Sequence, residues 1–125
     1  MKAKTVSSLK RKADKIFSEW VRSSNADWRG KVNCFTCGEI FRWQDVDAGH
    51  FITRKENTTR YDPENVKPQC RYCNRFREGA KAEFALKLGT ETVEKLVLKS
   101  RAVKQFKIAE LEEFISEYKD KLKKL

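Results

Sequence analysis

Residues 34–37 read Cys-Phe-Thr-Cys, residues 70–73 read Cys-Arg-Tyr-Cys, and Asp-Ala-Gly-His lies between them at residues 47–50. All 4 cysteines and the single histidine of this 125-residue chain fall within that stretch. Asn65 stands before the second cysteine pair and Asn74 follows it directly. This clustering predicts that the middle segment binds a structural metal and also carries a reactive centre.

The two cysteine pairs predict a structural zinc site. Structural Zn²⁺ takes four ligands in a tetrahedron, and two Cys-x-x-Cys turns supply four thiolates. The 32 residues between the pairs can carry a hairpin and a loop, whose base the metal would hold. Two disulfide bonds are the alternative. Because the chain begins Met-Lys-Ala-Lys without an apolar secretory segment, we expect the reducing cytoplasm and favour zinc. The ligands would be Cys34, Cys37, Cys70 and Cys73.

Length and composition predict one soluble domain with a modest core. The chain is 39% hydrophobic and 37% charged, with no stretch apolar enough to span a bilayer. A structural metal would add folding free energy that a small core lacks. We expect a basic N-terminal helix in residues 1–31, a metal-bound core in residues 32–88 and further helices in residues 89–125.

The net charge of +10 is unevenly placed. Residues 1–33 carry nine Lys/Arg against three acids, residues 34–79 carry eight against seven, and residues 80–125 carry eleven against eight. Such an excess indicates a polyanionic partner, most simply nucleic acid. A solubilising surface is the alternative.

Hydrophobic spacing predicts an α+β chain with helices at both ends. Val6, Leu9 and Ala13 begin a series at steps of three and four, which marks one helical face. Phe41 and Trp43 alternate with polar neighbours, as in a strand. The expected elements are a helix over 5–24, a β-hairpin over 39–53, a loop over 54–69, a helix over 71–88 ended by Gly89, a helix over 90–99 capped by Thr90, and a helix from 106 onward.

His50 would then lie on the second hairpin strand and Asn74 near the start of a helix. Hydrolysis of a phosphodiester needs a base that activates water and a cation that stabilises developing negative charge. Histidine suits the base because it titrates near neutral pH. Mg²⁺ prefers oxygen ligands and keeps several waters, so Asp47 and Asn74 suffice to hold it. A purely structural histidine is the alternative.

The order of these motifs resembles the HNH (ββα-metal) endonucleases. The residues that carry the resemblance are Cys-x-x-Cys, Asp-Ala-Gly-His-Phe, and Asn-Val-Lys-Pro-Gln-Cys-Arg-Tyr-Cys-Asn at residues 65–74. Within that group the chain is most similar to the NinG/Rap phage recombination nucleases, and more widely to phage endonuclease VII, a resolvase of branched DNA. The match is tight over about residues 32–79 and loose in the flanking helices.

The resemblance implies a role for each matching residue. The four cysteines would bind zinc, His50 would be the general base, and Asn65 would brace the loop that orients His50. Asn74 would bind Mg²⁺ or Mn²⁺. Many HNH enzymes carry an acidic ligand directly before the base, where this chain has Gly49. Asp47 faces the same side of an extended strand and could reach the ion directly or through water; a surface turn acid is the alternative.

Basic residues near this centre are predicted to bind DNA. Arginine grips phosphate with two parallel hydrogen bonds. Arg54 or Arg60 could also stabilise the transition state, and a solvated polar loop is the alternative for several of these residues. The predicted DNA contacts are Arg54, Lys55, Arg60, Arg71 and Arg75, with Arg77 nearby.

The C-terminal segment carries a heptad-like stripe that starts at Ile108 and Leu111 and ends at Leu125. It could pack on the similar stripe of the first helix within one chain, or across a homodimer. A twofold dimer would suit an enzyme that cuts two strands of a junction.

These features predict an α+β HNH endodeoxyribonuclease with structural zinc and catalytic Mg²⁺ or Mn²⁺, flanked by helices and acting on branched recombination DNA in the cytoplasm of a bacterial host. Two alternatives stay open. One is a general DNA-nicking nuclease, and the other is a non-catalytic, zinc-stabilised DNA-binding module, which would tolerate loss of His50.

Overall fold

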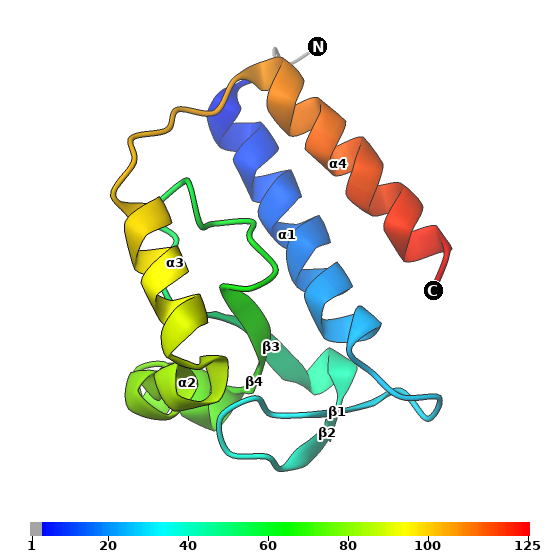
Figure 1. Cartoon of the computed structure of the whole chain (residues 1–125). Coiled ribbons are helices and arrows are strands. Elements are labelled where there is room, and N and C mark those ends of the chain that lie inside the picture. Colours follow the sequence, from blue (N-terminus) through cyan, green and yellow to red (C-terminus); the bar gives the residue numbers. More distant parts are fainter. Residues whose placement is uncertain (1–3) are drawn as a thin grey trace.

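The computed structural model describes residues 4–125, and it places two long helices beside a compact centre of short strands (Figure 1). Helices α1 (Val6–Ser24) and α4 (Ile108–Lys123) lie side by side and run in the same direction. The strands lie beyond the C-terminal half of α1, with α2 (Lys81–Leu88) and α3 (Thr90–Ser100) on their far side. The predicted α+β class is confirmed.

Helix α1 begins at a capping box. The Thr5 hydroxyl accepts from the Ser8 backbone N–H at 3.0 Å, and the Ser8 hydroxyl accepts from the Thr5 N–H at 3.2 Å, so two helix-start donors are satisfied. The buried side of the helix recurs every four residues, at Leu9, Ala13, Phe17 and Val21.

Helix α4 packs on that buried side through Leu111, Ile115 and Tyr118. Tyr118 meets the Phe17 ring edge-on, with ring centroids 5.4 Å apart. The two apolar stripes therefore pack against each other within one chain, the first of the two predicted arrangements. A homodimer stays a prediction, and it would need a surface other than these buried seams.

The strands form two separate antiparallel pairs. Strand β1 (Lys31–Asn33) pairs with β2 (Ile40–Arg42), and the first cysteine pair lies in the turn between them. A 3₁₀ turn at residues 43–45 leads into β3 (Val46–His50), which pairs with β4 (Val66–Cys70).

The predicted hairpin over 39–53 is therefore wrong, because its two strands belong to different sheets. The 3₁₀ turn redirects the chain, so β3 takes its partner from beyond the loop. The predicted loop over 54–69 also ends early, at β4. Pro68 suggested a loop, but β4 has one strand partner only, and proline is tolerated in such a strand.

The predicted helix over 71–88 is interrupted. A π-helical turn (Tyr72–Phe76) follows β4, and α2 starts only at Lys81. Between them Glu78, Gly79 and Ala80 all have positive φ, at 51°, 86° and 47°, which no helix accommodates. Gly89 does end α2, but it also occupies the cap position of α3, so the prediction that Thr90 caps the helix is wrong.

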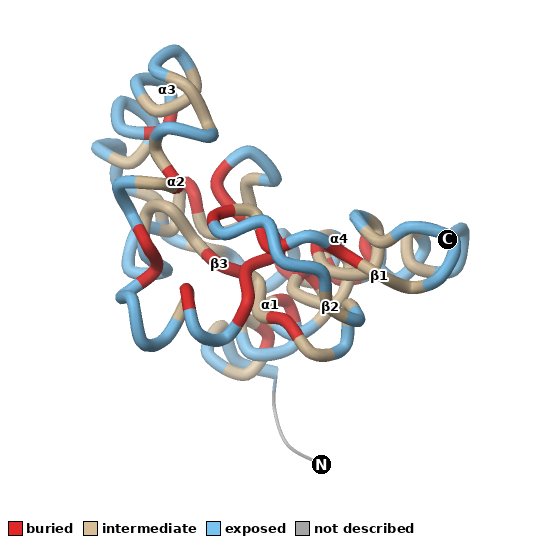
Figure 2. Tube along the Cα trace, turned by 90° about the horizontal axis from the view of Figure 1, so that it is seen from below, coloured by how far each residue is buried: buried red, intermediate tan, exposed pale blue. Residues whose placement is uncertain are grey.

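Burial divides the centre into two small cores. Figure 2 shows buried positions along the strands and on the facing sides of α1 and α4. One core lies between these helices and Val66, and the other contains Cys34, Cys70, Cys73 and Ala80. Within residues 4–125 no helix is long and apolar enough to cross a lipid bilayer.

Candidate metal and catalytic site

The four cysteines converge on one point. Their sulfurs all lie within 4.8 Å of one another, and none is in a disulfide. A tetrahedron with Zn–S bonds of about 2.3 Å has sulfurs about 3.8 Å apart, and the Sγ atoms of Cys37 and Cys70 are separated by 3.8 Å. The geometry and the donor chemistry of this cluster thus fit a tetrahedral zinc ion.

Backbone N–H groups favour a thiolate at one position of this cluster, Cys34. Cys34 Sγ accepts from the N–H of Cys70 at 3.2 Å and of Cys37 at 3.5 Å. Burial raises the pKa of the Cys34 thiol. These N–H groups and the Thr36 hydroxyl lower it by more, so that the pKa is about 6. Burial also raises the pKa of Cys70 to about 12. A bound cation would therefore have to displace the proton of the Cys70 thiol.

His50 ends strand β3 and its ring is held by the loop that follows. Its Nε2 lies 3.0 Å from the carbonyl oxygen of Arg60. Because a carbonyl only accepts, Nε2 carries the proton, and Nδ1 of the neutral ring keeps a lone pair. Burial lowers the pKa of His50, and the Arg60 carbonyl opposes this only in part.

Asn65 ties both ends of that loop together. It is fully buried, and its Oδ1 accepts from the N–H of Ile52 at 2.8 Å. Its Nδ2 donates to the carbonyls of Ile52 at 2.9 Å and Thr59 at 3.1 Å. Three bonds from one side chain fix the segment that carries the His50 contact.

The side chain of Asn74, on the helical turn that follows β4, contacts the side chain of Asp47 on β3. Asn74 Nδ2 donates to Asp47 Oδ2 at 3.0 Å, which leaves Asn74 Oδ1 for another partner. Arg75 also grips the Asp47 carboxylate with two bonds of 2.9 Å. Burial raises the pKa of Asp47, but Arg75 and Asn74 lower it more, so it is ionised near neutral pH.

Gly49 has no room for a side chain. A Cβ there would lie 2.1 Å from Oε1 and 2.9 Å from Cβ of Gln69, which is fully buried on β4. Gln69 is fixed in turn, because its Nε2 donates to the Gly79 carbonyl at 2.7 Å and to the Thr36 hydroxyl at 3.1 Å. An acidic residue directly before His50 is thus sterically excluded in this chain.

These groups line one cavity of about 690 Å³. His50, Asp47 and Asn74 lie on its wall, whereas Asn65 is fully buried and is not part of it. The base candidate and the candidate cation ligands thus face a common space large enough for a phosphodiester.

A family model described as "Bacteriophage Lambda NinG protein" matches residues 1–125. The chain belongs to the NinG family. No curated protein and no solved structure matches it.

Sequence reasoning missed the contribution of α1 to the cavity of this NinG-family chain. Asp14 accepts from Arg60 Nε at 2.8 Å, from Arg60 Nη2 at 2.6 Å and from the Tyr61 hydroxyl at 2.8 Å. Burial raises the pKa of Asp14, but these donors lower it more. The available signal was an acid inside a basic helix, one residue after the buried Ala13.

Lys81 was missed as well. Its ammonium, on an exposed side chain, donates to the carbonyls of His50 and Phe51, the latter at 2.8 Å. Burial lowers its pKa. The positive φ angles of residues 78–80 reverse the chain direction and bring Lys81 to the cavity. In the sequence, Gly79 was the one sign of this reversal.

Three of the predicted DNA contacts line the cavity and the other three do not. Arg54, Arg71 and Arg75 line the cavity, and Lys55 is exposed outside it. Arg60 lies elsewhere: its side chain is only 13% exposed and is paired with Asp14. Arg77 pairs with Glu83.

Proposed function

We propose that this NinG-family chain is a metal-dependent endodeoxyribonuclease of the HNH (ββα-metal) type. The observation that carries the proposal is the one cavity that His50, with a lone pair on Nδ1, lines together with the Asp47–Asn74 pair. Two antiparallel strands and a helical turn supply these groups, as in a ββα arrangement.

His50 is the general base of the proposed reaction. Its Nδ1 takes a proton from a water molecule, and the water oxygen then forms a bond to phosphorus while the bond from phosphorus to the leaving sugar oxygen breaks. The Arg60 carbonyl holds Nε2–H and so stabilises the imidazolium that forms. Asn65 fixes the loop that carries this carbonyl.

Asn74 and Asp47 would hold the catalytic cation. An amide and a carboxylate oxygen suit Mg²⁺ or Mn²⁺, and the ion would stabilise negative charge on the phosphate and the leaving oxygen. Because Arg75 neutralises the Asp47 carboxylate, Asn74 Oδ1 would be the direct ligand, and Asp47 would keep Asn74 oriented.

Zinc has a separate, structural role. The cysteine cluster joins the β1–β2 turn to the end of β4, immediately before the turn that carries Asn74. Zinc binding therefore fixes the position of Asn74 relative to β3. The cavity residues use oxygen and nitrogen atoms and do not share the thiolates.

The proposed substrate is branched recombination DNA. Phosphate contacts position a protein without reading sequence, and the cavity is bordered by Arg54, Arg71 and Arg75. Positive charge on both terminal segments as well as the centre suits several duplex arms better than a single groove. A general nicking activity is the second candidate, because the same arginines would hold a linear duplex.

The test is cleavage of end-labelled linear, forked and four-way DNA of equal length, with and without Mg²⁺. We expect Mg²⁺-dependent nicks, fastest on branched DNA, and loss of cleavage in His50→Ala. Gln105→Ala is the control, because Gln105 is an uncharged polar residue that is exposed and outside the cavity. Full activity of His50→Ala would refute the mechanism, whereas equal cleavage of all three DNAs would leave the nicking activity alone.

A further inference from the structure

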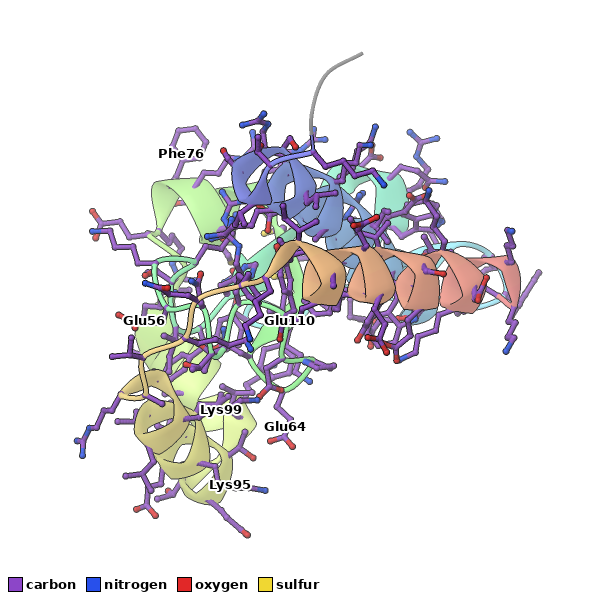
Figure 3. All side chains as sticks on the ribbon, turned by 90° about the horizontal axis from the view of Figure 1, so that it is seen from above. Glu56, Glu64, Phe76, Lys95, Lys99 and Glu110 are labelled. Carbon is purple, nitrogen blue, oxygen red and sulfur yellow. The ribbon has the colours of Figure 1, made fainter. Side chains whose placement is uncertain are left out.

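The helical turn that carries Asn74 also presents two exposed aromatic rings. Tyr72 is 64% exposed and Phe76 is 78% exposed. Their rings stack, with centroids 6.1 Å apart and planes at 25°. Figure 3 shows Phe76 projecting outward from the body of the protein. Water-exposed aromatic surface of this kind marks an interaction site.

A second hollow lies beside these rings. It measures about 560 Å³, its walls include Phe41 of β2 and Tyr72, and Cys37, Cys70 and Cys73 of the cysteine cluster also line it. Arg71 and Arg77 line it together with Glu39 and Asp45, with Arg77 paired to Glu83 and Asp45 to Arg42. Aromatic walls with polar groups that donate and accept hydrogen bonds match a nucleobase, and Arg71 is free of ion pairs within residues 4–125 and can meet its phosphate.

Arg71 joins this hollow to the catalytic cavity. It lines both spaces, and among residues 4–125 its guanidinium makes no ion pair. A DNA strand whose scissile phosphate lies near His50 would therefore pass Arg71 and bring a neighbouring nucleotide to Tyr72. Proteins that hold single strands combine a basic track with aromatic platforms in this way.

We propose that the hollow between Phe41 and Tyr72, extended by Phe76, binds an unpaired nucleobase of the DNA strand that enters the cavity. The site takes any base, because every base offers a face for stacking. It deepens the proposed function: branched DNA exposes unpaired bases where its arms meet, and a fully paired duplex does not. The site would thus supply the preference for branched substrates.

A second copy of the chain is the competing occupant of this face. The charge of Arg71 argues against it: this arginine makes no ion pair within residues 4–125 and would face its own copy, whereas Arg75 is paired with Asp47 and Arg77 with Glu83. DNA phosphates are complementary to that charge.

The experiment measures binding without cleavage, with Ca²⁺ in place of Mg²⁺. The probes are a single-stranded oligonucleotide carrying 2-aminopurine, a gapped duplex and an intact duplex. Tyr72→Ala and Phe76→Ala should each weaken binding of single-stranded and gapped DNA about tenfold, and should abolish the 2-aminopurine fluorescence change. Duplex affinity should change less than twofold, and Tyr72→Phe should behave as the wild type.

Trp28→Ala is the matched control, since Trp28 is an aromatic side chain 93% exposed in the turn after α1, outside both hollows. Equal losses for duplex and single strands, or no loss, would overturn the base-binding site. A wild-type dimer in ultracentrifugation that Tyr72→Ala dissociates would assign the face to a second copy instead. Base binding by a protein that never cleaves would refute the nuclease proposal alone.

Discussion

Asp14 of α1 holds both arms of the Arg60 guanidinium, at 2.8 and 2.6 Å, and the carbonyl of the same Arg60 accepts from His50. A helix far from β3 in the sequence therefore sets the position of the candidate base. The Asp14 and Arg60 side chains are only 18% and 13% exposed, so neither can exchange its partner for bulk water.

Asp14→Asn should destabilise the protein and impair cleavage. Removing one partner of a mostly buried pair leaves the other charge uncompensated, at a cost of about 3 kcal/mol. The measurement is urea unfolding together with cleavage rate. Glu112→Gln is the control: its partner Lys4 is 64% exposed, and such pairs contribute less than about 1 kcal/mol. Equal effects of the two changes would contradict the role of Asp14.

The pH dependence of cleavage should follow His50. Burial lowers its pKa below the ordinary 6.5, assisted by Arg54 and opposed by the backbone carbonyls of Arg60 and Ala48 and by Asp14. The base works only when neutral, so the acid limb of kcat/KM should lie below pH 6.5. His50→Ala should lose about a hundred- to ten-thousand-fold in rate across the whole range. An acid limb above pH 7 would contradict this.

The same shift links His50 to stability. The unfolded chain binds a proton on His50 at a higher pH than the folded chain does, so stability rises with pH through this window and falls as the pH drops through 6.5. His50→Gln should flatten that part of the profile, measured by urea unfolding at constant zinc.

One zinc ion per chain should co-purify with the protein and survive dialysis that removes Mg²⁺. Cys70→Ser should unfold the centre, because binding of a structural metal contributes directly to folding free energy. Metal analysis and circular dichroism provide the measurement. Mass spectrometry that found two disulfides and no zinc would reject the site.

Gly49→Ala should destabilise the fold by about 1–3 kcal/mol through overpacking against Gln69. The cause can be tested with a double-mutant cycle. If contact with Gln69 is responsible, Gly49→Ala should cost much less in a Gln69→Ala background, with a coupling above about 0.5 kcal/mol. Additive effects would show that the strain lies elsewhere.

The motif residues could be predicted from the sequence because their chemistry is local. Cys-x-x-Cys turns place their sulfurs through short-range geometry, and the Asn74–Asp47 proximity followed once a strand and a helical turn were expected. The cluster and the end helices accordingly agree with expectation.

Long-range pairing could not be predicted in the same way. Alternation at residues 41–50 identified strands but not their partners, because a period of two is the same for any pairing. The positive φ values of Glu78 and Ala80 have no sequence signal, since residues other than glycine rarely adopt them. The contribution of Asp14 and Lys81 to the cavity therefore could not be predicted from the sequence.

The last prediction separates Asn74 from Asp47. If Asn74 Oδ1 binds the cation and Asp47 only orients Asn74, Asn74→Ala should abolish cleavage while zinc content and unfolding stay normal. Asp47→Asn should still cleave, with a higher Mg²⁺ requirement, because an amide oxygen can accept the Asn74 bond. Arg75→Ala provides the decisive comparison, since it frees the carboxylate that Arg75 now neutralises. A lowered Mg²⁺ requirement in Arg75→Ala that Asp47→Asn removes would make Asp47 a direct ligand and reverse the assignment.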